Sequence, residues 1–177
     1  MESRRKRSRS QLLKWVCYGL LGLLCAVLQT TPGLFQLDAA KPLYLLPLAL
    51  AVAVFEDEFS GAVFGAVLGL LWDWLAGRTV GMLALELMVL CFAVSAVVQL
   101  YFKNTAFNFT VIASAAGLAV LTLDWLFFYY MPGYSGAAVR YLRFVLPAAA
   151  LTVPVCIPLF WAVGRIHEDF KIDNGVV

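Results

Sequence analysis

The stretch GAVFGAVLGLLWDWLAGRTVG, residues 61–81, decides the fold of this 177-residue chain. It is almost entirely apolar, and every fourth position is a glycine or an aspartate. Four residues turn an α-helix by about 400°, so these positions stay on one face and leave a groove without side chains. In a membrane, such a groove favours close contact with a second helix. The positions are Gly61, Gly65, Gly69, Asp73, Gly77 and Gly81.

The composition of the whole chain excludes a water-soluble globular protein. Hydrophobic residues make up 63% of it and charged residues only 14%. A helix needs about 20 apolar residues to cross a bilayer. The chain therefore predicts an all-α polytopic transmembrane bundle of about six helices, although its second segment would span only about 21 Å and its full crossing is left open. The predicted segments are 14–31, 42–55, 59–76, 80–102, 107–131 and 141–163.

Basic residues at the start of the chain predict its orientation. The stretch RRKRSR, residues 4–9, directly precedes the first apolar segment, and positive charge beside a membrane helix favours the cytoplasmic side. A nucleic-acid contact is the less favoured interpretation of this stretch. We therefore expect a basic cytoplasmic N-tail over residues 1–13, a six-helix membrane domain over 14–164 and a short cytoplasmic C-tail over 165–177.

Asp73 is the acid at the end of the glycine run. Counted along its helix, it lies in the outer half of the bilayer, where a charge costs several kcal/mol unless it is paired or hydrated. This favours a structural or recognition role inside the bundle. The alternative is an interfacial residue that caps the helix end between Trp72 and Trp74.

The same depth estimate places Glu86 and Asp124 in the outer half of the membrane. We expect these acids to join Asp73 in an outer polar cluster with one of three arginines, which can bind a carboxylate in a bidentate contact. The arginines are Arg78, Arg140 and Arg143.

On the opposite side, the acidic residues Glu56, Asp57 and Glu58 precede the glycine run. The simplest interpretation is a solvated turn whose charge suits the start of the next helix. A contact with a cytosolic protein is the alternative.

Enzymatic chemistry finds little support in the sequence. The single histidine, His167, lies beside Glu168 and Asp169 near the end of the chain and cannot build a metal site of the usual kind alone. The four cysteines lie in apolar segments and form no C-x-x-C pair. We expect no metal, no cofactor and no catalytic residues, although carboxylates alone are capable of acid/base work.

The short second segment, the acidic turn, and the run from Gly61 to Asp73 followed by Gly77 and Gly81 resemble the bacterial rod-shape-determining MreD family. The likeness is specific over about residues 42–90, and the chain length fits as well. It implies a non-enzymatic, multi-pass protein of the bacterial inner membrane. It also implies a fold similar to the six-helix substrate-binding subunits of energy-coupling-factor transporters.

The resemblance implies partners too: an MreC-like membrane protein, with the MreB filament and a peptidoglycan-synthesising transglycosylase and transpeptidase in a larger complex, besides membrane lipids. The basic tail, the glycine groove and the outer acids would be docking surfaces. The main alternative is a small-molecule-binding subunit of an energy-coupling-factor transporter, in which the outer polar cluster would be the ligand pocket. Neither the partner interface nor the stoichiometry follows from the sequence.

Overall fold

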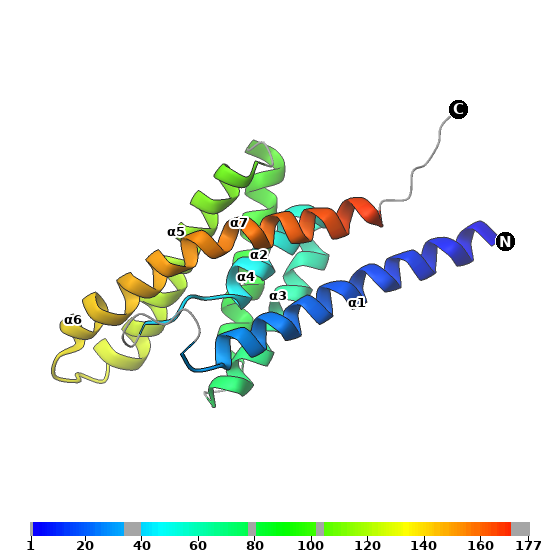
Figure 1. Ribbon diagram of the computed structural model, residues 1–177. Helices are drawn as coiled ribbons and strands as arrows, with labels where there is room; N and C mark the ends of the chain where they lie inside the picture. Colours follow the sequence, from blue (N-terminus) through cyan, green and yellow to red (C-terminus); the bar gives the residue numbers. More distant parts are fainter. Residues whose placement is uncertain (1, 34–39, 78–80, 102–104, 171–177) are drawn as a thin grey trace.

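The computed structural model describes residues 2–33, 40–77, 81–101 and 105–170, which form a bundle of helices (Figure 1). In chain order the elements are α1 (Glu2–Thr30), α2 (Leu45–Phe55), α3 (Glu58–Ala76), α4 (Met82–Tyr101), α5 (Ala106–Trp125), η1 (Leu126–Tyr130), α6 (Ala137–Arg140), η2 (Tyr141–Val145) and α7 (Leu146–Asp169). The elements η1 and η2 are short turns of the wider π-helix on either side of α6.

Among the described residues, five helical runs are long and apolar enough to cross a membrane. This confirms the predicted all-α polytopic fold. α2 is the exception, because its 11 residues extend only about 16 Å. The five runs are Arg9–Thr30, Glu58–Ala76, Met82–Leu100, Ala106–Tyr130 and Ala137–Asp169.

α2 lies at the centre of the bundle instead of facing lipid. Every residue from Leu45 to Val54 is buried, and α1, α3, α4, α5 and α7 all contact this helix. A helix that is apolar on all sides is suited to such a core position. The short second segment is therefore the core around which the longer helices pack.

The predicted second segment is helical only from Leu45 onward. Residues 40–44 form a non-helical strap, so their backbone amides need partners from elsewhere in the protein. The hydroxyl oxygen of Thr152 on α7 accepts the amide of Leu43 at 2.9 Å. The side-chain oxygen of Gln29 on α1 accepts the amides of Tyr44 and Leu45 at 3.0 and 3.1 Å. These two side chains allow a non-helical backbone to run through the bundle.

The first and last spans continue as helices into the predicted tails. α1 begins at Glu2, so the basic stretch is helical and continuous with the first span, and α7 continues to Asp169. The 29 residues of α1 extend about 44 Å, beyond the roughly 30 Å of a hydrocarbon core. The start of α1 and the end of α7 lie at one end of the bundle, and α6 lies at the other (Figure 1).

Candidate functional site

The glycine face of α3 packs directly against α4. A methyl group added to Gly69 would lie 2.4 Å from the Cα atom of Ala84, and one added to Gly65 would lie 2.7 Å from the sulfur of Cys91. Both distances are shorter than real carbon contacts, so only glycine permits this approach. α3 and α4 consequently form the most extensively packed pair of helices in the bundle.

Gly61 makes the same kind of approach to the central helix. A Cβ atom there would lie 2.6 Å from the Cα atom of Ala53 on α2. The groove along α3 is therefore filled by two helices of the same chain, and its buried glycines offer no free surface. A partner protein has to bind elsewhere on the molecule.

Asp73 organises the connection between α3 and α4. Its side chain is buried, with 1% of its surface exposed, and its Oδ2 atom accepts the amide of Gly81 at 2.8 Å. Gly77 and Gly81 both have positive φ angles, 62° and 107°, which glycine adopts readily. The last two glycines of the run therefore shape this turn, whereas the first three pack helices. Arg78, a predicted partner of the acid, lies outside the described residues.

The other members of the predicted outer cluster lie on different elements. Asp124 on α5 and Arg140 on α6 both line a cavity of about 240 Å³, together with Lys41 from the strap. Glu86 on α4 is half-buried, and Arg143 on η2 is exposed. A single cluster that unites these residues with Asp73 stays a prediction.

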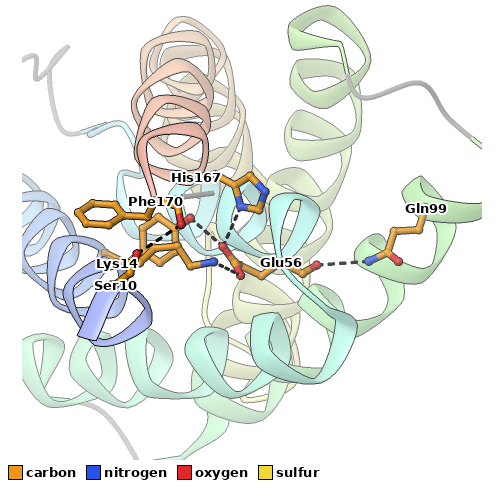
Figure 2. Close-up of polar contacts among 7 residues, drawn as sticks. Ser10, Lys14, Glu56, Gln99, His167 and Phe170 are labelled. Carbon is orange, nitrogen blue, oxygen red and sulfur yellow. Dashed lines mark hydrogen bonds and ion pairs between the residues drawn. The ribbon is translucent and has the colours of Figure 1, made fainter. Parts of the chain in front are cut away.

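Glu56 is the centre of a polar knot at the opposite end of the bundle (Figure 2). We use this name for the carboxylate of Glu56 with Lys14, Tyr18 and His167. The Lys14 ammonium donates to Oε2 at 2.7 Å, the Tyr18 hydroxyl donates to Oε1 at 2.9 Å, and Nδ1 of His167 lies 3.0 Å from Oε1. Gln99 of α4 also donates to the backbone oxygen of Glu56 at 3.3 Å. The knot joins the end of α2 to α1 and α7, and the contact from Gln99 adds α4.

The interpretation of the acidic residues as a solvated turn is wrong for Glu56. Only 10% of its side chain is exposed, whereas Asp57 is exposed and Glu58 is half-buried. Burial of the Glu56 carboxyl favours its neutral form, but the hydrogen bonds from Lys14, His167 and Tyr18 outweigh burial and lower its pKa below the ordinary value. The carboxylate is therefore charged at neutral pH and holds the knot together.

Sequence reasoning missed the knot because its members are far apart in the chain. Lys14 and His167 lie 42 and 111 positions from Glu56. Each residue alone resembles an ordinary charge near a helix end. The one available signal was an acid that directly follows a wholly apolar segment, since such an acid needs a partner when the segment is buried.

Comparison with known protein families settles what kind of protein carries these features. The family model described as rod shape-determining protein MreD matches residues 9–163. The chain belongs to the MreD family. The matched range extends from α1 far into α7 and includes the glycine run, Asp73 and most of the polar knot. Membership in the MreD family gives the chain a role in rod-shape determination, as a structural component of that process. No curated protein and no solved structure matches the chain.

Proposed function

We propose that this protein is a non-enzymatic membrane scaffold of the bacterial cell-wall elongation complex. In this role it binds an MreC-like membrane protein and connects it with the MreB filament and the peptidoglycan-synthesising transglycosylase and transpeptidase. The observation that carries the proposal is the family match across nearly the whole membrane domain. The hydrogen bonds and ion pair of Lys14, Thr152 and Asp73 also suit a scaffold, because such contacts join helices to one another and to the central strap.

We place the membrane contact with the MreC-like partner on α1 and α7, because α2 and α4 already fill the glycine groove of α3. A groove of about 420 Å³ runs between these helices, and apolar side chains line almost all of it. Its rim includes Leu24, which is 56% exposed, and Pro158. A membrane helix of the partner would bury this rim and gain van der Waals contact, the main attraction between helices in lipid.

In this proposal, the MreB filament contacts the basic N-terminal end of α1. The N-terminus would lie in the cytoplasm at the inner membrane, because the basic residues 4–9 precede the first span. The helix is long enough to carry them beyond the hydrocarbon core, and the polar knot sets the direction in which it leaves the bundle. The exposed Asp57 lies near this end as a second point of contact.

Complementation in a rod-shaped bacterium tests the proposal. Cells depleted of their own family member should regain rod shape when they express this chain, and cells that stay round would contradict the scaffold role.

A photo-crosslinker at Leu24 should capture the MreC-like protein during purification in mild detergent. The matched control is Leu85 on α4, a helix that does not line the groove; Leu85 is 62% exposed and should capture none. Co-purification of a transporter ATPase instead would favour the transporter alternative.

A further inference from the structure

An open groove lies beside α6. Figure 1 shows that α6 lies at the end of the bundle away from the start of α1. Its volume is about 730 Å³, within the range of small-molecule sites. Two arginines and several aromatic rings line it, and no carboxylate is among the described lining residues. The lining consists of Phe128, Tyr129, Tyr134, Ser135, Gly136, Ala137, Val139, Arg140, Arg143 and Phe144.

The guanidinium of Arg140 is held in place before any ligand arrives. It lies over the ring of Tyr129, 4.1 Å from the centroid, and 4.9 Å from the centroid of the Phe144 ring. One of its nitrogens donates to the Tyr129 hydroxyl at 3.0 Å. A guanidinium has five N–H donors, and the bond to Tyr129 uses one of them. Because the side chain is already ordered, binding costs little rotamer entropy.

The walls of the groove are built from the two π-helical turns. Phe128 and Tyr129 belong to η1, whereas Arg143 and Phe144 belong to η2. π-Helical turns are rare and occur frequently at functional sites. Two further bonds brace the walls: the Trp125 indole donates to the backbone oxygen of Ala137 at 2.8 Å, and the hydroxyls of Thr122 and Tyr141 lie 3.1 Å apart. The groove is thus braced by bonds between its walls, and two arginines line it.

The position of the groove in the membrane indicates which ligand is available to it. It lies where two membrane spans meet, since Ala106–Tyr130 ends and Ala137–Asp169 begins beside it. Tryptophan and tyrosine gather there, as they do at the level of lipid headgroups. Trp125, Tyr129, Tyr130, Tyr134 and Tyr141 are the residues concerned. The groups most abundant at this depth are the phosphates of the surrounding lipids.

We propose that the groove binds the phosphodiester of an anionic phospholipid headgroup, with Arg140 and Arg143 as its ligating side chains. The planar guanidinium matches two phosphate oxygens at once, which a lysine ammonium does not. A headgroup without a positive charge, such as that of phosphatidylglycerol, is preferred to phosphatidylcholine, because two arginines repel the choline group. This inference is independent of the proposed scaffold function and holds for whichever leaflet surrounds this end of the bundle.

Native mass spectrometry of the detergent-solubilised full chain tests the site. With phosphatidylglycerol and phosphatidylcholine supplied together, the wild type should retain phosphatidylglycerol preferentially. The double substitution Arg140→Gln with Arg143→Gln should reduce the retained phosphatidylglycerol on the order of tenfold. The control Arg165→Gln removes an exposed arginine near the other end of the same helical run and should leave retention unchanged. Equal retention of both lipids by the wild type, or unchanged retention by the double variant, would overturn the proposal.

Two further measurements distinguish headgroup recognition from attraction by net charge and from binding of soluble phosphate esters. Replacing both arginines by lysine keeps the charge but removes the guanidinium fork. Retention of phosphatidylglycerol should fall below the wild-type level, and retention equal to wild type would show that net charge alone attracts the lipid. Millimolar sn-glycerol 3-phosphate should not displace the lipid. Displacement would show that the groove takes soluble phosphate esters instead of membrane lipid.

Discussion

Gly69 shows how much one missing side chain determines in this protein. Because an added Cβ atom would meet the backbone of α4 and not a movable side chain, Gly69→Ala forces α3 and α4 apart. We expect it to lower the free energy of unfolding by about 1–3 kcal/mol, the usual cost of overpacking.

The matched control for Gly69 is Gly19→Ala on the exposed face of α1, where no atom lies within 4 Å of the added group. It should be neutral or slightly stabilising, because alanine favours a helix. Thermal unfolding of both variants in the same detergent is the measurement. Equal midpoints for Gly69→Ala and the wild type would contradict the close contact.

The carboxylate of Glu56 makes the stability of the bundle depend on pH. Its pKa in the folded protein lies below the ordinary value of 4.5. A lowered pKa means that the stabilisation is complete above about pH 4.5 and is lost as the pH falls through the lower, folded value. The midpoint of thermal unfolding should therefore decrease as the pH falls below about 4.5.

Glu56→Gln keeps the shape of the side chain but removes its charge. It should cost roughly 2 kcal/mol at pH 7, as expected for charge-assisted hydrogen bonds, and should flatten the acid-dependent decrease. Asp57→Asn, at the exposed neighbouring position, is the matched control and should change the midpoint at pH 7 far less, because the Asp57 side chain makes no capping hydrogen bond. A profile with the same slope in Glu56→Gln would show that other acids determine it.

Thr152 has a role that its neighbours on α7 do not share, because its hydroxyl accepts the amide of Leu43. Thr152→Val preserves the volume but leaves this buried amide without its acceptor, at a cost of about 1–3 kcal/mol. Thr110→Val is the matched control, since the Thr110 hydroxyl donates to the backbone of its own helix. Unfolding midpoints that shift equally in both variants would contradict the role of Thr152.

At the scale of the element, α2 differs from the other helices in having no face for lipid. Leu48 is fully buried at its centre, whereas Leu20 on α1 is 61% exposed. Leu48→Ala should cost about 2–5 kcal/mol through the cavity that it leaves. Leu20→Ala should change stability far less, because lipid or detergent fills the space, and the two variants can be compared by thermal unfolding.

The elements also show which parts of the fold could be predicted from the sequence. Long apolar segments such as 59–76 are present in the structure almost unchanged, because length and apolarity are local properties. The buried position of α2 could not be predicted, since apolar residues suit lipid and protein core equally well. The four-residue period of α3 marks a face but not its occupants, which are α2 and α4. The partners of Glu56 required the tertiary fold.

At the scale of the whole molecule, the polar knot and the α6 tip should lie on opposite sides of the membrane. Asp57→Cys and Ser135→Cys place thiols at exposed positions near the two ends, and three of the four native cysteines are buried. An impermeant maleimide should label Ser135→Cys in intact cells and Asp57→Cys only after permeabilisation. The reverse pattern would invert the orientation. Labelling of both from one side would contradict the bundle.

The enclosure of α2 has a consequence for biogenesis. A helix that is too short to cross the bilayer and has no lipid-facing side is not stable in the membrane until the helices around it have been synthesised. The ribosome synthesises α7 after the other described helices, yet α7 supplies Thr152 for the strap and His167 for the knot. The centre of the molecule therefore closes only after α7 has left the ribosome. A nascent chain that stalls before residue 146 leaves its core open to quality-control proteases.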